Sequence, residues 1–567
     1  MLQKPGIPEL AFQARHPCRR RNELRNASGW SAGCGVQLVK RVPRTGSCAM
    51  SRHKRFSVLL PVLVLCLGAS LSGCALLPSQ ENRTTSVAYR DTADSQLGKA
   101  VIPRVAANPG YSGIYPLRHA LDAFAARALL MRAAERSLDV QYYVWHKDTT
   151  GTLLFNGLYE AAERGVRVRL LLDDANASGL DTILAELDAH PNIEVRLFNP
   201  FVTRRARLLT YIFDFSRANR RMHNKSFTAD NQVTIVGGRN IGDQYFGAAG
   251  GQLFADLDIM AAGPVVHEVS NTFDRYWTSE SSYPLDRIVS PVASDSIAEL
   301  AAATSRVKND PATLAYISAV RDSPLMHKLL EGQLPLEWVT MQITSDDPAK
   351  GLGKAAPEAL LRHKLKQIIG KPATEVDLIS PYFVPAAAGV ASFVALAEQG
   401  VQIRILTNSL EATDVTLVHS GYAKWRKPLL KAGVRLYESR HLSPTLPESH
   451  GAGSIGSSFS GLHAKTFAVD RSRVFVGSFN FDQRSAAINT EMGFVINSPT
   501  LAQLITDAFR DNIPGKTYEV GLSDTGQLYW VERRDGEQVR HDVEPGTTFW
   551  QRARVWIISL LPIDWML

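Results

Sequence analysis

Cysteine is missing from most of this 567-residue chain, because all five cysteines lie within the first 74 residues. The body that follows therefore has neither disulfide bonds nor cysteine-ligated zinc. The apolar run at residues 56–69 is interrupted by Pro61 and is shorter than the ~20 residues that a spanning helix needs. With 45% hydrophobic and 21% charged residues, the composition excludes a disordered chain, a collagen, a small disulfide scaffold and a polytopic membrane protein.

Negative charge is also scarce at the N-terminal end. Residues 1–74 contain twelve Lys or Arg but only two Glu, a net charge of +10, whereas the remaining residues sum to −2. The overall charge of +8 therefore describes the leader and not the body. Because nucleic-acid binding relies on a basic surface, the near-neutral body argues against a nuclease and predicts no nucleic-acid partner.

The leader has the organisation of an export signal. A basic segment that starts at Met50 is followed by the apolar run and then by Leu71-Ser72-Gly73-Cys74. This order is typical of a secretory signal peptide, and its end resembles the bacterial lipobox, which implies lipid modification of Cys74. We interpret residues 50–73 as a lipoprotein signal peptide; an uncleaved anchor and a buried apolar helix are the alternatives.

This interpretation predicts an exported lipoprotein that is anchored to a membrane and faces the periplasm, with the inner and the outer membrane both open. Residues 1–49 lie upstream of the signal, show no hydrophobic period and are rich in Arg, Gly, Ser and Pro. We expect them to be a disordered upstream extension, with translation starting at Met50. A genuine basic arm is the alternative.

From residue 117 onward, apolar residues alternate between helical and strand spacing. We expect helices over residues 117–135, 152–164 and 180–189, and strands over residues 138–145, 166–172 and 193–198. Strands that alternate with helices of ten or more residues indicate an α/β fold with a largely parallel or mixed sheet covered by helices.

The sequence of the body repeats itself. The sequence of residues 163–171 is similar to that of residues 398–406, at an offset of 235. The sequence of residues 195–198 is similar to that of residues 434–437, at an offset of 239. Several similarities in the same order indicate an internal duplication. We predict a linker at 74–109, a first domain at 110–289, a connecting helical segment at 290–334, a second domain at 335–510 and a C-terminal extension at 511–567.

One motif, His-x-Lys-x4-Asp, occurs once in each predicted domain, and in each an Asn follows the His by seventeen residues. The two sets, in phase at an offset of 240, are His223, Lys225, Asp230 and Asn240, and His463, Lys465, Asp470 and Asn480. A structural histidine or a zinc site explains this phased pattern less well, since a lysine stands where a second metal ligand would be needed.

The spacing suits phosphate chemistry. If His-x-Lys lies on a strand, both side chains point to the same face of the sheet. Lysine and asparagine bind phosphate oxygens, and histidine attacks phosphorus or transfers a proton near neutral pH. Two such halves that meet about a pseudo-twofold axis would place two histidines on opposite sides of one phosphorus atom.

With these motifs the chain resembles the phospholipase D superfamily and, within it, the bacterial cardiolipin synthases of the C-type branch. Residues 138–145, 221–227, 237–243 and 548–552 support the resemblance, which covers about residues 110–567. It implies two pseudo-twofold-related phospholipase D-like α/β/α units with mixed sheets and the active site at their interface. It also implies a mechanism without a metal or another cofactor.

The resemblance further implies a two-step reaction through a phosphohistidine. In it, His223 is the nucleophile and His463 the acid and base, while Lys225, Lys465, Asn240 and Asn480 hold the phosphoryl oxygens. Two acidic residues outside the motif, Asp256 and Glu491, would orient the histidines. The motif aspartates Asp230 and Asp470 are expected to be structural.

The implied activity is phosphatidyl transfer onto phosphatidylglycerol to give cardiolipin, with phosphatidylglycerol or phosphatidylethanolamine as the donor. A phospholipase D-type hydrolase that releases phosphatidic acid shares every catalytic residue and is the alternative; a non-catalytic lipid-binding lipoprotein is a further one. Residues 549–567 contain three Trp and two Arg, which is typical of a membrane interface, although an ordinary buried helix would also fit.

Overall fold

The structure is a computed structural model that describes residues 77–248, 253–293, 297–330, 334–441, 461–534 and 536–567. The expected upstream extension at residues 1–49, the expected signal peptide at residues 50–73 and the lipidation site Cys74 lie outside the described residues. The described part belongs to one folded unit, Ala75–Leu567. Within it, no helix combines the length and the apolar character needed to cross a membrane.

The first half is built on a mixed sheet. Its strands are β1 (Ser112–Leu117), β2 (Ser137–Val144), β3 (Arg167–Asn176), β4 (Ile193–Phe198), β5 (Ser226–Ala229), β6 (Val233–Gly237), β8 (Asp258–Ala262) and β9 (Ser282–Pro284). They pair in the order β9-β4-β3-β2-β5-β6-β8-β1, in which only β2, β3 and β4 are mutually parallel. Its helices are α2 (Gln96–Ala106), α3 (Ala120–Ala133), α4 (Thr149–Glu163), α5 (Asp181–Asp188), α6 (Arg207–Phe213), α7 (Phe215–Ala218), α8 (Asp243–Phe246) and α9 (Pro264–Trp277).

The second half repeats this plan. Its strands are β10 (Glu337–Ser345), β11 (Glu375–Ile379), β12 (Gln402–Asn408), β13 (Arg435–Ser439), β15 (Thr466–Val469), β16 (Arg473–Gly477), β17 (Met492–Asn497), β18 (Thr517–Leu522), β19 (Leu528–Arg534) and β20 (Glu537–His541). The order is β10-β17-β16-β15-β11-β12-β13-β18-β19-β20. Its helices are α13 (Leu361–Ile369), α14 (Ala386–Glu398), α15 (Thr416–Ala423), α16 (Arg426–Lys431), α17 (Gln483–Ala487), α18 (Pro499–Asp507), α19 (Ile513–Lys516) and α20 (Phe549–Ser559).

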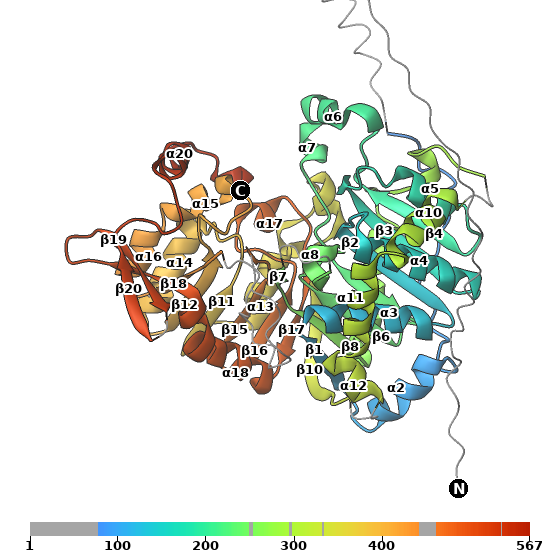
Figure 1. Cartoon of the computed structure of the whole chain (residues 1–567), viewed down its shortest axis with the longest axis horizontal. Coiled ribbons are helices and arrows are strands. Elements are labelled where there is room, and N and C mark those ends of the chain that lie inside the picture. Colours follow the sequence, from blue (N-terminus) through green and yellow to red (C-terminus); the bar gives the residue numbers. More distant parts are fainter. Residues whose placement is uncertain (1–76, 249–252, 294–296, 331–333, 442–460, 535) are drawn as a thin grey trace, which may run out of the picture. The chain divides into compact units, whose positions relative to one another are not determined.

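The two strand orders are related by a pseudo-twofold axis. Strands β1 and β10 pair antiparallel, so the two sheets join into one (Figure 1). Counted outward from that pair, each strand of the first sheet has a counterpart at the same position in the second sheet, which adds β19 and β20 at its far edge. An apolar cluster that includes Ile114, Val236, Val476 and Ile496 packs the halves together. The predicted α/β fold with two related units and mixed sheets is therefore confirmed.

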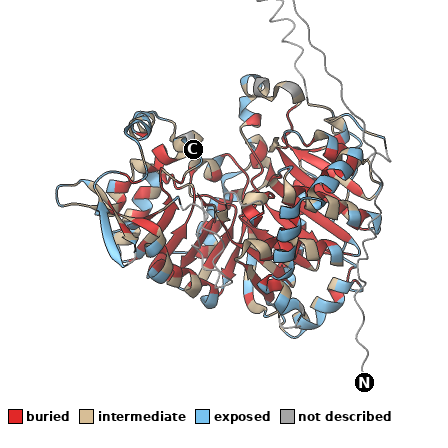
Figure 2. Ribbon diagram, in the orientation of Figure 1, coloured by how far each residue is buried: buried red, intermediate tan, exposed pale blue. Residues whose placement is uncertain are grey.

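Each half also contains an equivalent Arg–Asp ion pair between two parallel strands, fully buried in the first half and mostly buried in the second. Arg169 on β3 donates to Asp139 on β2 at 2.7 Å, and Arg404 on β12 donates to Asp377 on β11 at 2.6 Å. The parallel strands are buried along most of their length, because helices cover both faces of the sheet (Figure 2). Burying such charges is tolerated only when each has a hydrogen-bonded partner, which the matched pairs provide.

Several boundaries differ from the sequence-based expectation. Strand β18 pairs with β13 and occupies the position that β9 has in the first half, so the expected C-terminal extension at 511–567 continues the second sheet. The segment expected to be a linker contains α2, whose N-terminus is capped by Ser95. The connecting segment forms α10 (Ala298–Lys308), α11 (Pro311–Arg321) and α12 (Pro324–Leu330), which pack on α3 and α4 of the first half (Figure 1).

Candidate active site

The two histidines lie at the contact between the halves, in segments that run just ahead of β5 and β15. The expectation that His-x-Lys belongs to a strand is wrong, because these strands begin one residue after the motif lysines, at Ser226 and Thr466. The preceding residues pair with the opposite half instead. These contacts with the other half, made just before each histidine, orient the side chains of the motif.

The backbone contacts between the halves are equivalent on the two sides of the axis. The His223 N–H donates to the carbonyl of Thr490 at 2.9 Å, and the His463 N–H donates to the carbonyl of Ala255 at 2.9 Å. Short strands β7 (Phe254–Ala255) and β14 (Gly461–Leu462) pair in parallel and support the second contact. Each histidine is therefore tied to the residue that directly precedes the acidic residue of the other half.

Both histidine rings are held by those acidic residues. Nδ1 of His223 lies 2.9 Å from Oε2 of Glu491, and Nδ1 of His463 lies 2.6 Å from Oδ2 of Asp256. Both carboxyl groups are buried. When a carboxylate accepts from Nδ1–H, the ring is fixed in one tautomer and its Nε2 is left for chemistry.

The two motif lysines are buried beside the histidines, at 1% and 2% exposure. Lys225 Nζ donates to the carbonyl of His223 at 2.6 Å, and Lys465 Nζ donates to the carbonyl of His463. Burial lowers the pKa of Lys225 well below its usual value and that of Lys465 to about 8. The positive charge of Lys465 lowers the pKa of Lys225 further, and both lysines disfavour protonation of the two histidines. A phosphodiester anion would relieve this repulsion.

The carboxyl and imidazole groups differ between the two pairs. Burial lowers the pKa of His463 to about 4 and that of His223 well below its usual range, with the neighbouring lysines adding to both. Burial raises the pKa of Glu491 to about 7. Burial also disfavours the charge on Asp256, but the interaction with His463 and Lys465 outweighs it and holds the pKa at about 2.

The two motif asparagines are buried in the same region but have different partners. Asn240 accepts from the Val144 N–H at 3.3 Å and donates to the Tyr245 hydroxyl at 3.0 Å. The side-chain oxygen of Asn480 is buried without a hydrogen-bond partner among the described residues. This oxygen is an acceptor, so a ligand hydroxyl can donate to it, whereas only the amide NH₂ of Asn480 can donate to a phosphoryl oxygen.

The motif aspartates lie at the other end of their strands and do not join the histidine cluster. Asp230 accepts from the backbone N–H groups of residues 135–137, and Asp470 accepts from those of residues 373–375. Both have a left-handed φ of 51°, which aspartate tolerates better than most residues. They connect the β5–β6 and β15–β16 turns to the start of β2 and β11.

Aromatic rings complete the walls of the site, and sequence reasoning missed them. Tyr143 lies edge-on to His223 at 4.8 Å between ring centroids, and Tyr245 lies edge-on to His463 at 5.1 Å. Phe254 also contacts His463, at 5.4 Å. Tyr143 belongs to β2, where nothing in the sequence pattern separates a site residue from a core residue.

The residues at positions 238 and 478 correspond to each other in the duplication. They explain how acidic side chains of different length, Asp256 and Glu491, can each reach a histidine. A Cβ atom at Gly238 would lie 2.1 Å from Oδ1 of Asp256, so only glycine allows that close approach. In the second half Ser478 donates to Oε2 of Glu491 at 2.5 Å. The alignment itself contained this signal, a glycine in one half and a serine in the other. Among the described residues, no three His, Cys, Asp or Glu side chains are grouped to hold a metal ion.

Comparison with known proteins shows the family. The model of the family described as "Cardiolipin synthase, PLD-like domain" matches residues 128–277 and 365–513. The chain is 51% identical over 475 residues to cardiolipin synthase C of Escherichia coli, which covers 83% of this chain and 100% of that protein. It is 24% identical to a cardiolipin synthase of Listeria welshimeri over 73% of this chain and 71% of that protein.

A solved structure of phosphatidylserine synthase from Haemophilus influenzae is 15% identical, with a TM-score of 0.49, over 82% of this chain and 99% of that one. The duplicated motif, the matches in both halves and the identity over most of the chain agree. This chain belongs to the cardiolipin synthase family with PLD-like domains, within the phospholipase D superfamily.

Proposed function

We propose that this chain is a phosphatidyltransferase that makes cardiolipin from phosphatidylglycerol and a second phospholipid. The observation that carries the proposal is the single buried cluster in which each half supplies one His and one Lys and receives a carboxylate from the other half. The identity with a relative named cardiolipin synthase C supports phospholipids as the substrates.

In the first step, Nε2 of His223 attacks the phosphorus of the donor lipid. A P–N bond forms, the P–O bond to the headgroup alcohol breaks, and His463 gives its Nε2 proton to the departing oxygen. Lys225, Lys465 and Asn480 stabilise the charge on the phosphoryl oxygens. Burial keeps His223 neutral, as a nucleophile requires.

The second step reverses these roles. A hydroxyl of the acceptor phosphatidylglycerol transfers its proton to Nε2 of His463 and attacks the phosphohistidine, and the P–N bond breaks. His223 returns to its neutral form. His463 needs a higher pKa to act as the acid than the value of about 4 that burial and Lys465 give it without substrate. The anionic phosphodiester supplies negative charge beside it, and Asp256 stabilises the imidazolium.

Contact with a membrane is part of the proposal, because both substrates are lipids. Helix α20 and the residues after it expose large apolar side chains, with 77% of Trp550, 64% of Trp556 and 65% of Leu560 accessible. Arg554 is also exposed on this helix. A patch of aromatic and aliphatic residues beside a cation suits the interface of a bilayer that contains anionic lipids.

The localisation is proposed from the leader alone. A signal peptide at residues 50–73 would direct export, and lipidation at Cys74 would attach the protein to a membrane facing the periplasm, in either the inner or the outer membrane. Mass spectrometry of the N-terminal peptide tests this. A diacylated Cys74 is expected, and an unmodified peptide that includes residues 50–73 would contradict it.

Lipid analysis of cells that lack their own cardiolipin synthases tests the activity. Wild-type protein is expected to restore cardiolipin, and His223→Ala and His463→Ala are expected to leave it absent. Equal cardiolipin from all three proteins would reject the proposal. Phosphatidic acid formed only by the wild type, without cardiolipin, would assign the hydrolase activity, in which water replaces the lipid alcohol in the second step.

A further inference from the structure

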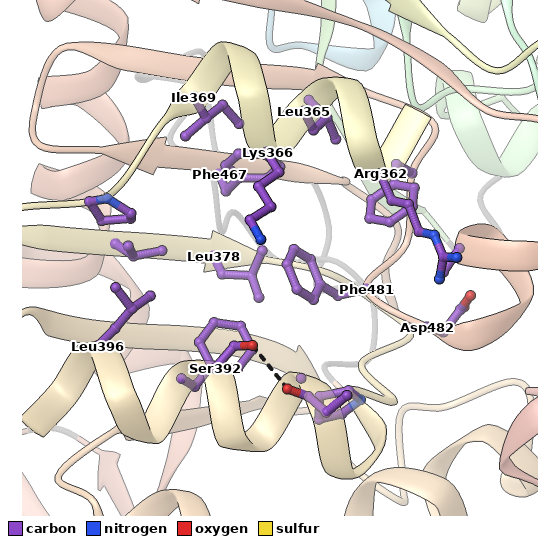
Figure 3. A pocket seen from close by; sticks show the side chains of 18 of the residues that line it. Arg362, Leu365, Lys366, Ile369, Leu378, Ser392, Leu396, Phe467, Phe481 and Asp482 are labelled. Atoms are coloured by element: carbon purple, nitrogen blue, oxygen red, sulfur yellow. Dashed lines mark hydrogen bonds between the residues drawn. The ribbon is translucent and has the colours of Figure 1, made fainter. Parts of the chain in front are cut away.

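The second half contains an apolar groove on the face of its sheet that α13 and α14 cover (Figure 3). It has a volume of about 460 Å³ and lies between α13 and α14, over β11 and β15. Its lining is mainly aliphatic and aromatic and includes Leu365, Leu378, Phe393, Leu396, Phe467 and Phe481. Ligand sites of proteins have this size and this mixture of an apolar wall with a few polar groups.

The first half fills the corresponding space with its own side chains. Residue 486 of the second half aligns with residue 246 of the first at the offset of 240, and here Ala486 lines the groove where Phe246 is fully buried. The Phe246 ring packs on Phe124 at 5.6 Å, and the Tyr316 hydroxyl, from the connecting segment, donates to its carbonyl. Helices α10, α11 and α12 then cover α3 and α4 (Figure 1).

The first half does contain an apolar cavity of about 380 Å³, but it lies elsewhere, among α2, α3, α12 and strands β1, β6 and β8. The groove in the second half is therefore a specific difference between the duplicated units. An alanine replaces the filling phenylalanine, and the connecting helices have no counterpart over α13 and α14 among the described residues.

The rim of the groove is cationic. Arg362 and Lys366 lie one turn apart on α13, are exposed, and have no ion-pair partner among the described residues. Figure 3 shows the Lys366 ammonium pointing into the groove. The acidic residue at the rim, Asp482, is buried and accepts from the Ser485 N–H. An apolar channel beside two unpaired cations complements an apolar chain that ends in an anionic group.

The groove is separate from the histidine cluster, although the same loop borders both. Side chains alternate along this loop: Phe479 and Phe481 line the groove, whereas Ser478 bonds Glu491 in the histidine cluster and the side chain of Asn480 lies outside the lining. A molecule in the groove would thus contact the back of the loop that positions Asn480.

We propose that this groove binds one acyl chain of an anionic phospholipid, with the lipid phosphate at Arg362 and Lys366. The lipid is held in addition to the two that react. The proposal rests on the proposed function only for the choice of lipid, since a lipid-modifying enzyme at a bilayer meets such molecules at high local concentration.

Photolabelling tests the proposal. The full chain carrying His223→Ala, which removes turnover, is placed in phosphatidylcholine vesicles that contain phosphatidylglycerol with a diazirine on one acyl chain. After irradiation, labelled peptides are mapped by mass spectrometry. We expect label in residues 361–372, 386–396 and 479–486, which form the groove.

Two pairs of variants sharpen the test. Ala486→Phe copies the first half and is expected to lower groove labelling about tenfold by occupying the space, whereas Ala487→Phe, at an exposed neighbour, leaves it unchanged. Arg362→Glu with Lys366→Glu is expected to lower labelling by the phosphatidylglycerol probe about tenfold but not labelling by a phosphatidylcholine probe. Arg132→Glu, on the exposed side of α3, is the matched control.

Equal groove labelling in Ala486→Phe and Ala487→Phe, or label confined to peptides that contain His223 or His463, would overturn the proposal. So would a lower sedimentation mass for Ala486→Phe than for wild type, which would assign the groove to a second copy of the chain. Because labelling needs no turnover, a failure of cardiolipin synthesis and a failure of groove binding give different results.

Discussion

The histidines of the two halves have the same backbone setting but different acidic partners. His463 is held by Asp256, which approaches through the space that Gly238 leaves, while His223 is held by the longer Glu491, which also accepts from Ser478. The pKa of Asp256 is held at about 2 by His463 and Lys465 despite burial, whereas burial raises that of Glu491 to about 7. A duplicated site has thus become two environments with different proton affinities.

This difference matches the division of labour that we propose. A permanently ionised partner stabilises an imidazolium, which is what His463 needs when it holds a proton between the two steps. A weaker partner leaves His223 neutral and nucleophilic. A symmetric fold can therefore give its two histidines different chemical roles through two differences between the halves. Gly238 and Asp256 in the first half correspond to Ser478 and Glu491 in the second.

Replacing either histidine is expected to have the largest effect on the rate of transfer. His223→Ala and His463→Ala should each lower transfer about 10³-fold or more. With a phosphatidyl nitrophenol donor, whose leaving group needs no proton, His463→Ala should still form the phosphoenzyme and accumulate it, whereas His223→Ala should form none. Acid quenching and mass spectrometry of the motif peptides measure this. A phosphoenzyme in His223→Ala but not in His463→Ala would reverse the assignment.

Replacing the acidic partners should have the next largest effect and should distinguish the halves by pH. Asp256→Asn is expected to lower kcat about 10²–10⁴-fold across the whole range from about pH 5 to 9, because its carboxylate is ionised throughout.

Glu491 should instead shape the pH profile. As the pH falls through about 7, its carboxyl becomes protonated and can no longer accept from His223, so the wild-type rate should fall below that pH. Glu491→Gln should lower the rate at high pH and lose this acidic limb. An unchanged limb in Glu491→Gln would show that another group controls it. The pH dependence of kcat for both variants is the measurement.

The two asparagines offer a smaller contrast. Asn480→Ala should lower kcat/KM about 10²-fold with little change in thermal stability, because the Asn480 side-chain oxygen has no partner in the protein. Asn240→Ala should lower stability as well, since it loses hydrogen bonds to Val144 and Tyr245. The measurements are kcat/KM and the thermal unfolding temperature of both variants. Equal losses of stability in the two variants would contradict the predicted difference.

Replacing the motif aspartates is expected to have the smallest effect, which should be seen in the free energy of unfolding. Asp230 is fully buried, and Asp230→Ala leaves three backbone N–H groups without their acceptor, so unfolding should become easier by about 1–3 kcal/mol. Asp470 is half-buried, and water replaces part of its bonding, so Asp470→Ala should fall at the lower end of that range. Denaturant unfolding measures both. A larger loss for Asp470→Ala would contradict the argument from burial.

Much of the fold follows from local sequence. Strand β4 has the expected bounds, and α3, α4, β2 and β3 lie within a few residues of expectation, because periodicity and burial are local properties. The mistakes came from distant partners. The expected C-terminal extension supplies β18 to the second sheet, and the His-x-Lys segments pair with the other half instead of entering a strand.

The sequence by itself determined the duplication, the α/β class and the two His-Lys pairs of the site, since a repeated motif in phase is visible without coordinates. Only the tertiary structure decided which acid serves which histidine. The His223–Glu491 contact spans 268 residues and the His463–Asp256 contact spans 207, each crossing from one half to the other. The same holds for the groove beside Ala486. Local patterns in the sequence reveal the helices and strands of each half. The contacts between the halves cannot be read from such patterns, because they form only when the two folded surfaces pack together.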